Sequence, residues 1–166
     1  MRSIELTLDE STDAAVRAEW RTLAEHGLPS LASHTAASNA PHVTVAAGGR
    51  LTADTVPVEA FGVLPLAARF SALSTFAAAR ERFVLVRTIV VTAELLALHA
   101  EILATTAEPV ETSRPGAWTP HVTLARRLTA EQVGVAHALL GSPDDGTFTA
   151  ARFWDGDTKT ITPLAP

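Results

Sequence analysis

Hydrophobic and polar positions along the chain alternate in two different periods. Ile4 to Leu8 alternates with a period of two, which predicts a half-buried strand. The β-branched, apolar run from Phe83 to Val91 predicts a second strand. Apolar residues then recur at helical spacing over about 12–25 and about 92–106, where Thr92 is a suitable N-cap. The two parts of the chain therefore begin with the same strand-helix order.

The same two parts carry an internal repeat of a short histidine motif. Pro41-His42-Val43-Thr44 recurs as Pro120-His121-Val122-Thr123, 79 residues later. Each copy is followed by a related segment, Arg50 to Asp54 in the first case and Arg127 to Glu131 in the second. Repetition of both motif and flanks indicates two similar structural units.

Each motif strand is followed by a helix start and a further strand. Thr129 with Gln132 fits a capping box, whereas Thr52 lacks such a partner and Pro57 disturbs the first of these helices. The remaining strands are predicted at about 67–76, 148–154 and 159–162.

This element order predicts an α+β fold built from two lobes. The lobes are related by a pseudo-two-fold axis, their antiparallel sheets flank a central cleft, and the helices lie outside. We expect a single bilobal domain over residues 1–166, with lobe-forming repeats of approximately 1–78 and 79–166.

The two motifs place histidine and threonine side chains together. Residues i and i+2 of a strand point to one face, so His42 projects with Thr44 and His121 projects with Thr123. If the lobes face each other, one imidazole can accept a proton while the other donates one. The hydroxyls can donate hydrogen bonds to phosphate oxygens, where charge gathers in the transition state. This scheme needs neither metal nor cofactor.

The chain resembles the 2H phosphoesterase superfamily, which includes 2′-5′ RNA ligase-like proteins and RNA 2′,3′-cyclic phosphodiesterases. The residues that carry the resemblance are 41–45 and 118–126, and the second segment is the closer match. The resemblance implies metal-independent opening or joining of 2′,3′-cyclic or 2′-5′ phosphodiester linkages. It also implies that His42 and His121 are the acid-base pair and that Thr44 and Thr123 hold the phosphate.

The substrate expected from the composition is small. The net charge is −5, and nine aromatic residues without tyrosine offer few stacking platforms. Ala46 to Gly49 stands where relatives often have Phe-Leu-Gly. We therefore expect a small cyclic phosphate, a nucleotide or an RNA end as substrate, with no extended nucleic-acid surface.

Other candidate residues surround the second motif. Strand alternation puts Arg127 on the side of His121 and Arg126 on the other, and one of them is a candidate phosphate clamp. Trp118 lines the mouth of the pocket or packs in the core. Arg50, the repeat equivalent of Arg127, and His34 are weaker candidates.

The rest of the composition limits the size of the core and the chemistry that the protein can carry out. Apolar residues make up 47% of the 166 residues, enough for a sizeable core, and the absence of cysteine excludes thiolate chemistry. We expect neither a membrane span nor a signal peptide, and therefore a cytoplasmic protein. We also expect a monomer. Two alternatives stay open, namely a non-catalytic phosphate- or nucleotide-binding module of the same fold and a metal-dependent hydrolase.

Overall fold

The fold is known from a computed structural model that describes residues 1–36 and 38–166. The strands are β1 (Arg2–Leu8), β2 (His42–Gly48), β3 (Leu66–Ala68), β4 (Phe70–Ala78), β5 (Arg82–Ile89), β6 (His121–Leu128), β7 (Gly146–Asp155) and β8 (Thr160–Ala165). The helices are α1 (Glu10–Glu25), α2 (Ala93–Thr105) and α3 (Ala130–Leu139), with short 3-10 turns η1 (Leu31–Ser33), η2 (Ala53–Thr55), η3 (Val58–Val63) and η4 (Glu111–Ser113). In the described part of the chain, no helix is both long and apolar enough to cross a membrane.

Each α-helix begins at a side chain that caps it. Asp9 accepts a hydrogen bond from the backbone N–H of Thr12, and Thr92 caps α2 in the same way. Thr129 and Gln132 form a reciprocal capping box at α3. The helices expected at about 12–25 and 92–106 and the capping box are confirmed.

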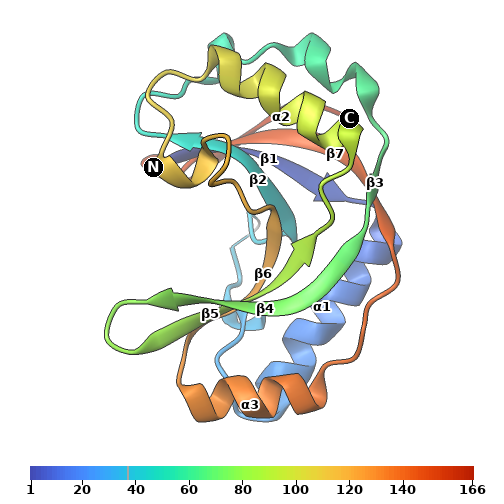
Figure 1. The fold of residues 1–166 in the computed structure, drawn as a ribbon, viewed down its shortest axis with the longest axis vertical. Helices are drawn as coiled ribbons and strands as arrows, with labels where there is room; N and C mark the ends of the chain where they lie inside the picture. Colours follow the sequence, from blue (N-terminus) through green and yellow to red (C-terminus); the bar gives the residue numbers. More distant parts are fainter. Residues whose placement is uncertain (37) are drawn as a thin grey trace.

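All strands belong to one curled sheet with antiparallel pairing. Its order is β3-β7-β1-β2-β6-β5-β4, and β8 pairs with β7 beside β3. The two halves of the sheet meet where β2 and β6 share a single register pair, Val43 with Val122. Beyond this pair β2 and β6 separate, and the sheet curves around an open side (Figure 1). The α+β class with antiparallel pairing is confirmed, with the two expected sheets joined into one.

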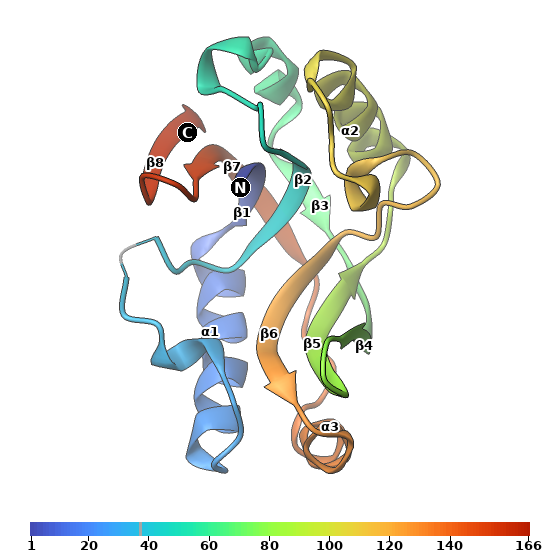
Figure 2. The ribbon, with the colours of Figure 1, turned by 90° about the vertical axis from the view of Figure 1, so that its left-hand side faces the viewer.

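The two sequence repeats exchange elements across this junction. β4, from the first repeat, pairs with β5 of the second, and β7, from the second, pairs with β1 of the first. Two helices cross over too, because α2 packs against β2 and α1 contacts β6, whereas α3 stays against β5 and β6 of its own repeat (Figures 1 and 2). We therefore propose one bilobal domain over residues 1–166 in which each half of the sheet draws on both repeats.

Two local predictions differ from the structure in the segment after the first motif. The helix expected after Thr52 is replaced by the 3-10 turns η2 and η3, because Pro57 between them has no N–H to donate. The strand expected at 67–76 is two strands, since β3 pairs with β7 and β4 pairs with β5. The chain thus passes from one half of the sheet to the other near Arg69.

The core lies between the outer face of the sheet and the helices. Most of the largest fully buried side chains come from β1, β5, β6, β7 and the helices that cover them, among them Ile4, Leu6, Leu23, Leu85, Leu95, Ile102, Leu124, Leu128 and Phe148. Arg87 on β5 is also buried, and its guanidinium pairs with the Glu19 carboxylate of α1 and donates to the Gly141 carbonyl. A buried charge needs such partners, so this pair fixes α1 against the sheet.

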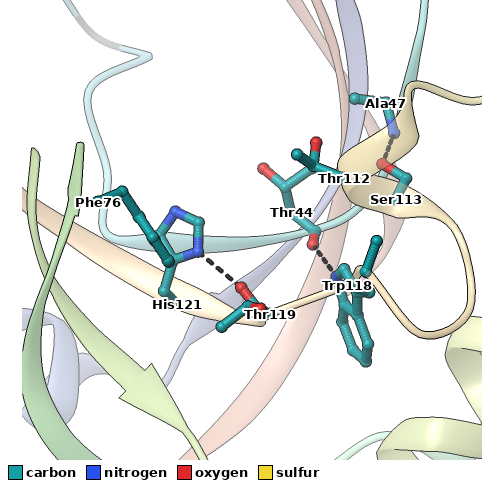
Figure 3. A pocket seen from close by; sticks show the side chains of 9 residues that line it. Thr44, Ala47, Phe76, Thr112, Ser113, Trp118, Thr119 and His121 are labelled. Carbon is teal, nitrogen blue, oxygen red and sulfur yellow. Dashed lines mark hydrogen bonds between the residues drawn. The ribbon is translucent and has the colours of Figure 1, made fainter. Parts of the chain in front are cut away.

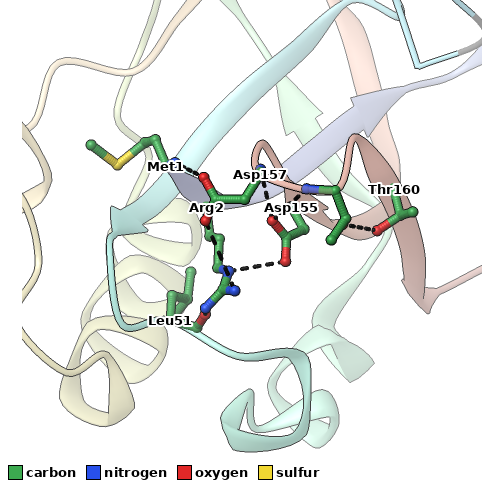
Figure 4. A network of polar contacts seen from close by, with 7 residues as sticks. Met1, Arg2, Leu51, Asp155, Asp157 and Thr160 are labelled. Atoms are coloured by element: carbon green, nitrogen blue, oxygen red, sulfur yellow. Dashed lines mark hydrogen bonds and ion pairs between the residues drawn. The ribbon is translucent and has the colours of Figure 1, made fainter.

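A polar network holds the beginning of β1 in place (Figure 4). The terminal ammonium of Met1 donates to Asp157 over 3.1 Å. Arg2 donates to Asp155 over 3.0 Å and to the Leu51 carbonyl over 3.4 Å. The start of β1 is thereby attached to the β7–β8 turn and to the segment after β2.

The Asp9 carboxylate connects the start of α1 to β7 through hydrogen bonds, so its ionisation should affect the stability of the fold. Its carboxylate accepts hydrogen bonds from Ser11, Thr12 and the backbone N–H of Thr147. These bonds, that from Ser11 first, outweigh burial and hold the pKa of Asp9 well below its usual range. The folded pKa lies below the unfolded one, so the stabilisation is complete above about pH 5 and is lost as the pH falls.

We expect Asp9→Ala to lower the free energy of unfolding at pH 7 by about 1–2 kcal/mol, measured by urea denaturation. The difference from the natural chain should shrink below about pH 4, where the Asp9 carboxyl of the unfolded chain becomes protonated while that of the folded chain stays ionised. Asp144→Asn, at an exposed carboxylate, is the control and should leave the unfolding energy unchanged. A difference independent of pH would contradict the linkage.

Candidate active site

The two motif histidines have the same local geometry. His42 opens β2 and His121 opens β6, each directly after a proline. The Nδ1 of each ring lies 2.7 Å from the carbonyl oxygen two residues earlier, that of Ala40 in one case and Thr119 in the other. A carbonyl only accepts, so each Nδ1 carries the proton and donates it. In both rings Nε2 is left as the nitrogen available for proton transfer.

A β-bulge follows each histidine at the same position. Thr44 pairs with Glu5 and Ala46 with Ile4, so Val45 has no partner on β1. On β6, Leu124 is skipped in the same way between Thr123 and Ala125. A bulge interrupts the alternation of faces. The fifth residue after each histidine, Ala47 or Arg126, therefore returns to the cleft side.

An indole N–H satisfies the motif threonine carbonyl beside each bulge. Trp118 donates to the Thr44 carbonyl over 3.0 Å, and Trp20 of α1 donates to the Thr123 carbonyl over 3.1 Å. Trp118 also stacks on the buried ring of His99, with centroids 3.9 Å apart. Trp118 therefore packs on His99 and also borders the cavity beside His121 that is described next.

A cavity of about 530 Å³ opens beside His121 (Figure 3). It is lined by apolar and hydroxyl-bearing side chains from both halves of the sheet: Thr44, Ala47, Phe76, Thr112, Ser113, Ala117, Trp118, Thr119 and His121. Phe76 meets the His121 ring edge to face, with centroids 4.9 Å apart. This cavity has room for a group the size of a nucleoside and no charged lining besides the imidazole.

A second cavity of about 440 Å³ contains His42 and shares Thr44 and Ala47 with the first. Its lining is more polar, and includes Glu5, His34, Asn39, Arg126, Arg152 and Trp154. Since the two cavities adjoin at Thr44, they form one cleft with a histidine in each part.

The environment of His121 favours its neutral form. Burial is the main cause that lowers the pKa of His121, and the positive charges of His42 and Arg126 lower it further. The hydrogen bond to the Thr119 carbonyl acts in the opposite direction and is outweighed. At neutral pH, Nε2 of His121 is therefore a free base.

His42 instead faces a buried ion pair. Its Nε2 lies 3.6 Å from Oε1 of Glu5, an ion pair whenever the ring is protonated. Glu5 also accepts from the Ser3 hydroxyl over 2.7 Å and from Arg152 over 2.8 Å. Arg152 comes within 3.4 Å of His42 Nδ1, but that nitrogen already donates to a carbonyl, so the contact is electrostatic and not a hydrogen bond.

The arginines of the second motif lie opposite to the order expected from strand alternation. Arg126 lines the His42 cavity, whereas Arg127 has a positive φ of 66° and lines a separate groove at the end of the sheet. The bulges in β6 shift the parity, which explains the reversal. His34 lines the His42 cavity, and Arg50 pairs with Glu108 at the surface.

The sequence pattern did not single out Glu5, Arg152, Phe76 or Trp154. All four occupy strand positions that face the cleft, and in the sequence each is only one position of an alternating strand. Charged or aromatic residues on the motif side of a predicted strand were the signal that could have identified them. Among the described residues, no group of three or more histidine, aspartate or glutamate side chains is placed to hold a metal ion.

Comparison with known proteins identifies the family and supports the fold. The sequence profile of the 2′-5′ RNA ligase superfamily matches residues 8–155. Among solved structures, the chain is similar to Usb1 of Kluyveromyces marxianus, with a TM-score of 0.55 over 99% of this chain and 97% of that one. The identity between the two is 10%, so this likeness concerns the fold. No curated protein matches the sequence.

Phe76 provides a test of the His121 environment. We expect Phe76→Ala to expose the imidazole and to raise the pKa of His121 toward the ordinary 6.5, because burial is the main cause of its lowering. The measurement is an NMR titration of the ring. Phe76→Leu, which keeps an apolar cover, is the matched control, and an unchanged titration in the alanine variant would refute the assignment.

The buried pair behind His42 gives a second test. We expect Arg152→Met to lower the free energy of unfolding by about 3 kcal/mol, because it leaves the Glu5 carboxylate buried without its partner. Combining it with Glu5→Leu should restore most of that loss. Arg50→Met, which breaks an exposed pair, is the control and should change stability little. If the double variant lost the sum of the unfolding free energies that the two single variants lose, the coupling between Glu5 and Arg152 would be contradicted.

Proposed function

We propose that this chain, which belongs to the 2′-5′ RNA ligase superfamily, is a metal-independent phosphoesterase that acts on 2′,3′-cyclic phosphate or 2′-5′ phosphodiester linkages. The observation that carries the proposal is the matched pair of histidines. His42 and His121 each donate Nδ1–H to a backbone carbonyl and lie in the two parts of one cleft. This arrangement leaves two oriented Nε2 atoms for general acid-base catalysis.

The two histidines divide the proton transfers of ring opening. His121 accepts a proton from water at Nε2 while the water oxygen forms a bond to phosphorus. On the opposite side the bond from phosphorus to the ribose oxygen breaks, and that oxygen takes a proton from Nε2 of His42. The lowered pKa of His121 supports its role as the base. The Glu5 carboxylate supports His42 as the acid, because it lies beside the nitrogen that carries the proton.

The phosphate is held by hydroxyl and guanidinium groups of the motif strands. Thr44 borders both cavities, so its hydroxyl is suited to donate to a non-bridging oxygen. Thr123 occupies the equivalent register position on β6, although it is not among the residues that line the two cavities. Arg126 is the guanidinium of the second motif that reaches the cleft. We assign it, in place of Arg127, to the charge that develops on the phosphate oxygens.

The test is turnover of 2′,3′-cyclic nucleotides and of a short RNA that ends in a cyclic phosphate, followed by phosphorus NMR in the presence of chelator. We expect His42→Ala and His121→Ala to lose on the order of 10²–10⁴-fold in rate, the usual contribution of a general acid or base. His137→Ala, at an exposed position of α3, is the matched control and should keep full activity.

The outcomes separate the candidate functions. Ring opening by the natural chain but not by either variant would support the proposal, and the position of the product phosphate would show which ribose oxygen leaves. Full activity in a variant lacking both histidines would end it. Tight binding of these ligands without turnover would favour the non-catalytic phosphate-binding module.

A further inference from the structure

Three arginines surround a groove outside the histidine cleft. Arg80 and Arg82 come from the β4–β5 hairpin and Arg127 from the end of β6. The groove measures about 890 Å³ and is completed by Pro29, Ala78, Ala79 and Gln132. Within residues 1–36 and 38–166, no ion pair shorter than 4.0 Å involves any of these arginines. In a chain of net charge −5, this is a concentration of positive charge without paired carboxylates.

The carboxylates nearby do not neutralise the groove. Glu81 occupies the turn between the two hairpin arginines. Glu131 lies at the start of α3 with its pKa lowered mainly by backbone and Thr129 hydrogen bonds and only last by the charge of Arg82. Three guanidinium groups therefore face two exposed carboxylates, one of which is already engaged at a helix N-terminus.

Two of the arginines have a backbone conformation that is unfavourable for any residue with a side chain. Arg80 has a φ of 60° and Arg127 a φ of 66°, in the left-handed region that favours glycine or asparagine. Glu81 shares this conformation in the hairpin turn. At position 80 the turn of the β4–β5 hairpin requires this conformation, and Glu108 and Lys159 adopt it elsewhere in the described chain. Glycine is therefore the replacement that removes the charge at positions 80 and 127 while keeping the backbone.

The groove continues the floor of the cleft. Ala78 pairs with Arg82, and the next pair on the same face is Phe76 with Val84, two residues or about 7 Å along the strands. Phe76 lines the His121 cavity, and Arg126, which lines the His42 cavity, directly precedes Arg127. Figure 1 shows the β4–β5 hairpin projecting beyond the body of the sheet. A path thus leads from His121 over Phe76 to the three arginines.

We propose that this arginine groove binds a backbone phosphate of an oligonucleotide whose terminal phosphodiester lies between the two histidines. The inference rests on the proposed function of the cleft. Guanidinium groups bind phosphate through paired N–H donors, and a base can stack on Phe76 between the two phosphate positions. The His121 cavity is large enough for only a short piece of the substrate, so the next part of the strand follows this path. Because of the groove, we expect the substrate of the site to be an RNA end and not a free cyclic nucleotide.

The test compares an oligonucleotide with a mononucleotide. A labelled tetraribonucleotide carrying a 3′-phosphate and the matching nucleoside 3′-phosphate are titrated against the full chain, by fluorescence anisotropy and calorimetry respectively. The main variant is Arg80→Gly/Arg82→Ala, because glycine suits the positive φ at position 80 and preserves the turn. The matched control is Arg50→Ala/Arg69→Ala, which removes two exposed arginines elsewhere.

We expect the hairpin variant to bind the tetranucleotide at least tenfold more weakly and with a shallower dependence on salt, because fewer phosphates are neutralised. Its affinity for the mononucleotide and the affinities of the control variant should be unchanged. Adding Arg127→Gly should weaken oligonucleotide binding further. Equal binding by the hairpin variant and the control, or equal weakening for both ligands, would overturn the groove assignment, and thermal melting of each variant verifies its fold.

Binding and turnover report on different claims. Oligonucleotide binding that depends on the hairpin arginines, without turnover of any cyclic substrate, would support the groove and refute the phosphoesterase proposal. Opening of a cyclic-ended tetranucleotide with the same KM in the hairpin variant as in the natural chain would support the phosphoesterase and refute the groove.

Discussion

The cleft depends on a pair of β-bulges placed three residues after each motif histidine. Each bulge buries two consecutive residues, Val45 with Ala46 on β2 and Leu124 with Ala125 on β6. The strand direction then changes so that β2 and β6 diverge after their single shared pair. This divergence accompanies the two adjoining cavities, each of which is lined by one of the motif histidines.

The backbone of the two half-sites is nearly equivalent, but their side chains are not. Register places three pairs of cleft-facing residues in matching positions, namely Glu5 and Val86, Arg152 and Ser74, and Trp154 and Phe76. One half is therefore charged and the other apolar. Histidines held by identical hydrogen bonds receive different electrostatic surroundings, which suits a reaction that needs one base and one acid at the same pH.

Much of this could be predicted from the sequence, because local signals determined it. The period-two strands, the capped helices and the repeated His-x-Thr motifs depend on neighbouring residues. The positions of Arg126 and Arg127 depended on bulges, which alternation alone does not indicate. The pairing of Glu5 with Arg152 required knowing that β7 lies beside β1, a contact between residues almost a chain length apart.

The exchange of elements between the two repeats has a consequence for how such a chain can arise and fold. A single repeat in isolation would leave its first strand without the neighbour that the other copy supplies. Two identical copies could complete each other only as a domain-swapped dimer, and joining them in one chain turns that association into an intramolecular step. β1 closes against β7 only when nearly the whole polypeptide is present, a topology rich in distant contacts and correspondingly slow to fold.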